Sequence, residues 1–246
     1  MHIYGVIIGS EILNGRRKDA HFAFLQMLLA HYGHTLYASF IIKDDRELIK
    51  HTFELIKNDP QSVLFSFGGI GSTPDDLTRE IAAEVFTQKS LIVHPQFHQD
   101  ILNRFGEDAY PFRIHMADLP QGAMLLPNPI NNMSGFFLDN RFFFVPGFPQ
   151  MAHPMIAHAM EHYIPKASHS YRKTLFAHCS ENDICHLMQD LPETIDLSSL
   201  PQLIDGKPHV SLSLSGSDID EVSRYFAQFE TYLRQKGVTF NLVDND

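Results

Sequence analysis

The chain has 246 residues, of which 44% are hydrophobic and 20% are charged, a composition typical of globular proteins. Its formal net charge of -10 disfavours a nucleic-acid surface, because phosphate backbones are neutralised by lysine and arginine. No apolar run reaches the roughly 18 residues that a membrane span needs, and two cysteines do not make a disulfide framework. We therefore expect a cytoplasmic protein that binds neither nucleic acid nor membrane.

Strands and helices are predicted to alternate through the first hundred residues. The opening apolar run, IYGVIIG, is typical of a buried parallel strand, and Asp19 and Gly33 are suited to the two ends of the helix that follows. Alternation of this kind predicts a parallel sheet with helices on both faces. The predicted order is strand 3–9, helix 19–32, strand 34–42, helix 45–58, strand 62–67, and helices starting at Thr73 and near Pro95.

The alternation ends after about residue 110. LPQGAMLLPNP (119–129) predicts an ordered loop, SGFFLDNRFFFVPGFP (134–149) a β-hairpin, and 151–164 a helix that Pro165 ends. The remaining residues predict a separate small α+β domain. Its expected elements are strand 171–178, a helix capped by Ser180, strand 209–215, helix 218–236 and strand 238–243. The predicted fold is thus a three-layer α/β/α sandwich over residues 1–165 and a small α+β domain over 166–246.

The segment SFGGIGSTPDDLTREIAAE (66–84) combines three glycines with two adjacent carboxylates. On a purely structural interpretation, Thr73 caps a helix and Asp75 and Asp76 occupy its first turn, where they complement the helix dipole. Capping alone does not require the glycines, however, and loops at the carboxyl end of a parallel strand commonly bind ligands. Adjacent carboxylates tolerate a phosphate if a divalent cation lies between them. The segment therefore also predicts a phosphorylated ligand bridged by Mg²⁺ or a similar metal.

Several motifs resemble those of the CinA-type proteins (competence/damage-inducible protein A), within the MoaB/Mog molybdopterin-binding superfamily. GGIGSTPDDLT resembles the family's GGLGPTxDDLT, and GSEILNG (9–15) resembles GTELLxG. LPQGAMLLPNP and the hairpin that leads into PGFPQM also match, so the resemblance covers residues 1 to about 160. The tail resembles the small α/β region that follows in these proteins.

The resemblance implies a Rossmann-like sandwich that binds molybdopterin or an adenine dinucleotide, and metal-dependent hydrolysis of pyrophosphates such as ADP-ribose or FAD. By motif position it matches Glu11 and Asp76 to acidic positions of the family. On chemical grounds, Glu11, Asp75 and Asp76 are expected to hold the metal, and Asp76 and Asp75 to be the catalytic residues. The resemblance leaves the oligomeric state open, with a homo-oligomer as one option. The ligand-binding residues expected from the matched motifs and their neighbours are Gly9, Glu11, Gly68, Gly69, Gly71, Ser72, Thr73, Asn128 and Gly147.

Three departures from the family pattern lie at this expected site. Phe67 stands where a threonine is usual, Ser72 replaces a proline, and RRKDAH (16–21) replaces an Asn-rich stretch. The substrate is therefore left open. The alternatives to hydrolysis are a non-hydrolytic molybdopterin-binding module and an adenylyltransferase-like enzyme of molybdenum cofactor biosynthesis.

Some residues have both a structural and a functional interpretation. Asn128 between two prolines suits a turn as well as a ligand contact. The basic cluster Arg16-Arg17-Lys18 suits a solvated loop, but a role with an anionic ligand stays open. His158 and His162 have the i, i+4 spacing of zinc ligands, yet HAMEH is not the HExxH motif, and a helix surface is favoured.

Overall fold

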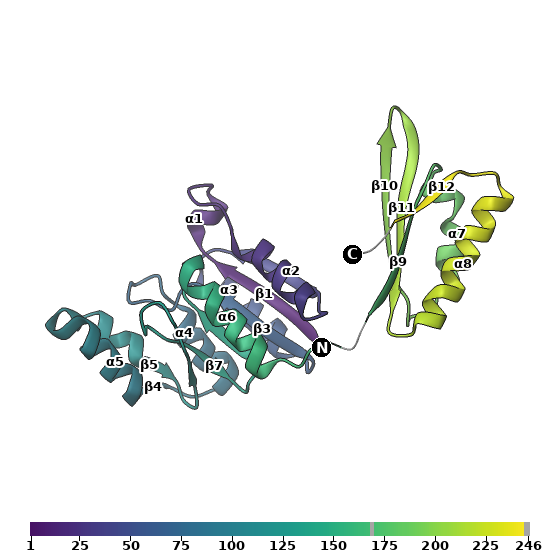
Figure 1. Ribbon diagram of the computed structural model, residues 1–246. Coiled ribbons are helices and arrows are strands. Elements are labelled where there is room, and N and C mark those ends of the chain that lie inside the picture. Colours follow the sequence, from purple (N-terminus) through teal and green to yellow (C-terminus); the bar gives the residue numbers. More distant parts are fainter. Residues whose placement is uncertain (168–169, 244–246) are drawn as a thin grey trace. The chain divides into compact units, whose positions relative to one another are not determined.

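The computed structural model describes residues 1–167 and 170–243, and the chain forms two compact units, Met1–Lys166 and Ala167–Asp246 (Figure 1). Each unit has its own buried apolar core. Within the described part of the chain, every helix is too short or too polar to cross a membrane.

The first unit is built on a six-stranded mixed sheet with the order β2-β1-β3-β8-β7-β6. Strands β2, β1, β3 and β8 are parallel neighbours, whereas β7 and β6 are added antiparallel at one side. The mostly parallel sheet that the sequence predicted is therefore confirmed. The strands are β1 (His2–Ile8), β2 (Leu36–Ile42), β3 (Ser62–Phe67), β6 (Met124–Leu126), β7 (Gly135–Leu138) and β8 (Phe142–Val145).

Helices cover both faces of this sheet and complete the predicted three layers (Figure 1). Helices α2 (His21–His31) and α6 (Pro149–Tyr163) pack on one face. The other face is covered by α3 (Arg46–Lys57), α4 (Thr78–Ala82), the π-helix η1 (Ala83–Thr87) and α5 (Pro95–Phe105). Helix α5 is preceded by β4 (Leu91–Val93) and followed by two short 3-10 helices, η2 (Gly106–Ala109) and η3 (Arg113–Ala117), and by β5 (Asp118–Pro120), which pairs with β4 in a two-stranded sheet.

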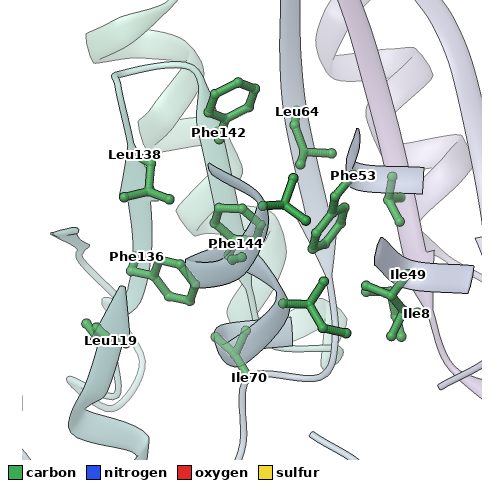
Figure 2. Packing of buried hydrophobic residues seen from close by; sticks show 14 of the residues in the cluster. Ile8, Ile49, Phe53, Leu64, Ile70, Leu119, Phe136, Leu138, Phe142 and Phe144 are labelled. Atoms are coloured by element: carbon green, nitrogen blue, oxygen red, sulfur yellow. The ribbon is translucent and has the colours of Figure 1, made fainter. Parts of the chain in front are cut away.

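Alternate residues of each central strand point to opposite cores, because successive side chains of a strand face opposite sides. In β8, for example, Phe142 and Phe144 pack in the core under α3, whereas Phe143 and Val145 pack under α2 and α6. Figure 2 shows the first of these cores, in which Ile70 of the glycine segment lies with the strand residues. The loop that follows β3 is thus anchored by an apolar side chain.

One prediction for the first unit is wrong in part. The proline-rich segment 119–129 is not entirely a loop, because it contains the end of β5 and the whole of β6. Strand β6 forms by pairing with the hairpin strand β7, from Met124 opposite Phe137 to Leu126 opposite Gly135. Pro127 and Pro129 follow β6 and lie outside its paired residues, whereas Pro120 pairs with Leu91 of β4, at the edge of a short two-stranded sheet.

The second unit has the element order βαββαβ and an antiparallel sheet, β10-β11-β9-β12, the arrangement of ferredoxin-like folds. Its longest helix is capped by Asp218 and buries one stripe of apolar residues, as amphipathic helices do. The elements are β9 (Tyr171–Ala177), α7 (Cys185–Gln189), β10 (Asp196–Ile204), β11 (Lys207–Gly216), α8 (Ile219–Gln235) and β12 (Phe240–Val243).

Two details of this unit differ from the prediction. Strand β10 was not predicted, because most of its side chains are exposed and its sequence lacks an apolar alternation. Ser180 does form a capping box, but with the short 3-10 helix η4 (Glu181–Asp183), and α7 begins only afterwards. The predicted single helix is therefore two short pieces.

Candidate functional site

A cavity of about 490 Å³ lies where the parallel strands of the first unit end. Loops that follow three neighbouring strands, β1, β3 and β8, contribute Glu11, Gly68–Thr73 and Pro146–Phe148 to its wall. Because parallel strands have their carboxyl ends at one edge, residues far apart in the sequence meet there. The predicted ligand residues found in this lining are Glu11, Gly68, Gly69, Gly71, Ser72, Thr73, Asp75, Asp76 and Gly147.

The glycine loop after β3 is held by the backbone of its neighbours. Gly68 has a positive φ of 97°, and a side chain there would collide with the carbonyl oxygen of Ile8 at the end of β1. Its N–H donates to the carbonyl of Val145 at the end of β8, at 2.9 Å. Thr78 closes the loop, since its Oγ1 donates to Gly68 at 3.0 Å and its N–H to Gly69 at 2.9 Å. Glycine is required here because both the torsion angle and the space exclude a Cβ atom.

Arg79 supports the same loop from beneath, a role that the sequence did not indicate. The side chain is only 9% exposed, and its Nη2 donates to the carbonyl of Gly71 at 2.7 Å. Its Nη1 donates to the carbonyl of His115 in η3. Burial lowers the pKa of the Arg79 guanidinium, while the nearby Asp76 opposes this shift. Arg79 therefore connects the glycine loop to η3 and adds a buried positive charge near Asp76.

The predicted capping role of Thr73 is wrong. Helix α4 begins only at Thr78, so Asp75 and Asp76 lie in the turn before the helix and not in its first turn. Thr73 donates instead of accepting, from its N–H and its Oγ1 to Oδ2 of Asp76 at 2.8 and 2.7 Å. A Cβ atom at Gly71 would lie 2.6 Å from the same Oδ2, so the third glycine makes room for this carboxylate.

Glu11 and Arg17 also line the cavity. Glu11 lies in the short helix α1 (Ser10–Leu13), which was not predicted. Nη1 of Arg17 is 3.8 Å from Oε1 of Glu11, and the guanidinium lies 5.4 Å from the ring centroid of Phe148. Of the basic cluster at 16–18, only Arg17 lines the cavity. A guanidinium here can contact an anionic group of a ligand.

Other lining residues were not predicted from the sequence. Asp44 follows β2, and its Oδ2 accepts a hydrogen bond from the N–H of Ser10 at 2.8 Å. Strand pairing brings this carboxylate to the site, because β2 is the neighbour of β1. Arg113 lies 4.9 Å over the ring of Phe105. An apolar region completes the lining with Phe97, Phe105, Met116, Met133 and Met151.

Two predicted ligand residues, Asn128 and Gly9, do not line the cavity. Phe67, which departs from the family pattern, does not face it either. Asn128 is 2% exposed, and its amide nitrogen donates to Asn131 and to the carbonyl of Met133, as a turn residue does. Gly9 lies behind the Glu11 carboxylate, which a Cβ atom would approach to 3.0 Å. Phe67 is fully buried in the core under α2 and α6, so this side chain does not replace a group that faces the cavity.

A metal ion would have to be held by the carboxylates of this cavity. In residues 1–167 and 170–243, no group of three or more His, Cys, Asp or Glu side chains is placed so that it could hold one. Glu11, Asp75 and Asp76 nevertheless line the same cavity. Mg²⁺ is commonly held by one or two carboxylates with phosphate oxygens and water, so these residues fit an ion that arrives with a phosphate. The three carboxylates are not grouped closely enough to share one ion, so a metal held by one or two of them together with a phosphate stays a prediction.

Residues 5–166 match the MoCF_biosynth family, described as "Probable molybdopterin binding domain". The chain belongs to this molybdopterin-binding domain family. The match covers the unit that contains the cavity, and it confirms the resemblance predicted from the glycine-rich motifs.

Known members of the family include proteins that are longer than this chain. The chain is 34% identical to a CinA-like protein of Nostoc punctiforme over 61% of its own length and 37% of that protein. It is 27% identical to a CinA-like protein of Acaryochloris marina over 94% of its own length and 57% of that protein. The chain therefore spans about a third to a little over half of these relatives. Among solved structures, the protein CinA of Thermoplasma acidophilum superposes with a TM-score of 0.60 at 26% identity, over 67% of this chain and 99% of that one.

Proposed function

We propose that the first unit binds a nucleotide pyrophosphate, such as ADP-ribose or FAD, and hydrolyses it with the help of a divalent metal. The observation that carries this proposal is the meeting of the glycine loop with Glu11, Asp75 and Asp76 in one cavity. Backbone N–H groups of a glycine-rich loop suit phosphate oxygens, and carboxylates suit a cation that accompanies them.

The charges of the cavity support this proposal. Four carboxylates line it (Glu11, Asp44, Asp75 and Asp76), but only two guanidinium groups (Arg17 and Arg113). The negative charge of the cavity would therefore repel a pyrophosphate, unless a cation binds with it. A divalent metal, when bound, would neutralise the two phosphates and stabilise the negative charge that develops on the leaving phosphate.

The chain's own residues have distinct roles in this proposal. The Gly68–Ser72 backbone binds one phosphate, and Arg17 contacts the other. Asp76 is oriented by its two hydrogen bonds from Thr73, which leave Oδ1 available to a metal or to the attacking water. The apolar region around Phe97 and Phe105 suits the flat ring of a nucleobase or pterin, since aromatic side chains stack on such rings.

The family match supports a second function, which is binding of molybdopterin without hydrolysis. Molybdopterin also combines a flat ring system with a phosphate, so the apolar region and the glycine loop of the cavity suit it as well. The two functions differ in whether Asp75 and Asp76 take part in bond cleavage or only in binding.

Turnover assays separate these functions. The chain would be incubated with ADP-ribose and with FAD, with Mg²⁺ or Mn²⁺ added, and mononucleotide products would be measured by chromatography. We expect AMP release with metal and none with EDTA. Binding of molybdopterin, followed by its fluorescence, would run in parallel. Tight molybdopterin binding without cleavage of any dinucleotide would favour the second function and contradict the first.

A further inference from the structure

A buried histidine lies directly behind the wall of the cavity. His21, the first residue of α2, is 3% exposed, and its ring stacks on that of Phe67 with centroids 4.3 Å apart. Its Nε2 is 3.3 Å from the carbonyl oxygen of Gly147, which lines the cavity. The ring is buried, stacks on Phe67 with one face and meets the ring of His153 edge-on, so its orientation is defined by packing.

The contacts define where the protons of this ring lie. A carbonyl oxygen can only accept a hydrogen bond, so the Nε2 of His21 carries the proton. In a neutral ring, Nδ1 is then an acceptor, and its partner is Nε2 of His153 at 3.3 Å. His153, on α6, therefore donates from Nε2, and its ring is held by a parallel stack on Phe24 at 3.8 Å. Each ring has one tautomer that satisfies both contacts.

The chain of contacts ends at the glycine loop. Gly147 packs against Gly68 so closely that a Cβ atom on Gly147 would lie 3.4 Å from the Cα atom of Gly68. The two loops that face a ligand therefore touch at these glycines. We propose that His21 is a positioning residue, which fixes the Gly147 carbonyl and thereby the Gly147–Phe148 wall of the ligand cavity. The inference rests on the proposed function only in assigning the ligand to this cavity.

The charged groups around His21 are consistent with a neutral ring. Those that act on it are Asp19, Arg17 and His153. Burial lowers the pKa of His21 to about 4, and it also lowers the pKa of His153. A proton added to Nδ1 of His21 would face the N–H of His153, and two donors repel each other. Acid should therefore disrupt the contact between the two rings, while Nε2 of His21 still donates to the Gly147 carbonyl.

The first test needs no ligand. Nitrogen-15 NMR of the full chain reports the tautomer and the titration of His21. We expect a neutral ring with the proton on Nε2 at pH 6 to 7, and no titration until below about pH 5. A proton on Nδ1, or a titration midpoint near 6.5, would overturn the proposal.

The second test compares histidine variants of the full chain. His21→Phe keeps a ring against Phe67 and removes the donor to Gly147, whereas His21→Gln keeps a donor. His158→Phe is the matched control, because it replaces an α6 histidine whose ring contacts His162 and not the cavity. We expect faster amide exchange at Gly68, whose N–H donates to Val145 beside Gly147, in His21→Phe, partial recovery in His21→Gln and no change in the control. Unchanged exchange in a folded His21→Phe chain would overturn the proposal.

The same variants give a binding measurement with ADP-ribose and Mg²⁺. We expect about tenfold weaker binding in His21→Phe and recovery to within about threefold in His21→Gln. If His21→Phe does not fold, His153→Phe replaces it, because this change keeps the stack on Phe24 and removes only the donor to His21. We then expect altered Nδ1 resonances of His21, and unaltered ones would contradict the proposal. Absence of ADP-ribose binding in the parent chain would count against the proposed function alone, because tautomer and amide exchange are measured without ligand.

Discussion

The two units of this chain place their loops in different ways. In the first unit, β1, β3 and β8 run parallel, so the loops after Ile8, Phe67 and Val145 leave the sheet at one edge. In the second unit, strands adjacent in the sheet are antiparallel, so the loops that follow two adjacent strands leave at opposite edges. Both units bury an apolar core, and in the first unit the parallel strands bring three loops together around a cavity of about 490 Å³.

This difference explains why the chemistry is expected in the first unit. Glycines, carboxylates and an arginine from three loops meet there, although the first of them, Glu11, and the last, Gly147, are 136 positions apart in the sequence (147 − 11). The second unit, over residues 170–243, has one apolar core between its antiparallel sheet and its helices. Its expected contribution is support or assembly. This division, with ligand chemistry in the first unit and support in the second, can be tested by substitutions in either unit.

The largest effect is expected from opening either core. Leu64→Ala in the first unit and Leu212→Ala in the second both remove a fully buried side chain and should each cost about 2–5 kcal/mol of unfolding free energy. Hydrogen exchange measured by mass spectrometry should show the loss in residues 1–166 for the first variant and in 170–243 for the second. Weaker ADP-ribose binding by Leu212→Ala than by the parent would contradict the division of roles.

A similar effect, on turnover alone, is expected from Asp76→Asn. The change keeps an acceptor for Thr73 but removes the charge, and loss of one such contact in the transition state costs about 2.7–4 kcal/mol, a rate loss of roughly 10²–10³. The melting temperature should change little. Asp139→Asn is the control, because this carboxylate lies in the β7–β8 turn at a positive φ that asparagine tolerates. Equal turnover of the two variants would end the catalytic role of Asp76.

A smaller effect is expected from closing the space at Gly68. Gly68→Ala adds a Cβ atom against the Ile8 carbonyl, whereas Gly122→Ala adds one at a similar positive φ with nothing within 4 Å. Both variants have the torsional strain of about 1 kcal/mol. The difference between their unfolding free energies, measured with urea, therefore reports the collision with Ile8 alone, which we expect to cost about 1–3 kcal/mol. Equal stabilities would show that the loops of β1 and β3 are not in the close contact described.

The smallest effect is a dependence of stability on pH. Because the pKa of His21 is lowered to about 4 in the folded chain, the unfolded chain binds more protons between about pH 4 and 6.5. The contribution of neutral His21 to the free energy of unfolding is therefore complete above about pH 6.5 and is lost as the pH falls towards 4. We expect the parent to lose roughly 1–2 kcal/mol more than His21→Phe between pH 7.5 and 5. The unfolding free energies of the parent and of His21→Phe would be measured with urea across this pH range, with His158→Phe as control. The same dependence on pH in the parent and in His21→Phe would contradict this prediction.

The sequence predicted the parts of the fold that depend on local patterns. Strands such as β1 and β3 are short apolar runs, and α3 combines the Asp45 cap with one apolar stripe. Strand β10 could not be predicted, since pairing with β11, and not its own sequence, makes it a strand. The start of α4 was predicted too early, because Thr73-Pro74-Asp75 suits a turn as well as a helix cap.

The candidate site was predictable where the residues belong to one motif. Gly68, Gly69, Gly71 and Asp76 lie within nine residues, and the structure places them all in the cavity wall. Asp44 and Arg113 reach the same wall through strand order and the packing of η3, which no local pattern reveals. His21 was not predicted either, because its role depends on Gly147, which is 126 residues away in the sequence.

The central claim, that the ligand binds among the loops of the parallel sheet, is tested most directly by mapping ADP-ribose on the full chain. Amide resonances would be followed by NMR during a titration with ADP-ribose in the presence of Mg²⁺, and again with EDTA. We predict that the largest shifts fall on Gly68–Asp76 and Gly147 when Mg²⁺ is present, while residues 170–243 do not respond. Shifts confined to the second unit, with an unchanged glycine loop, would contradict the account.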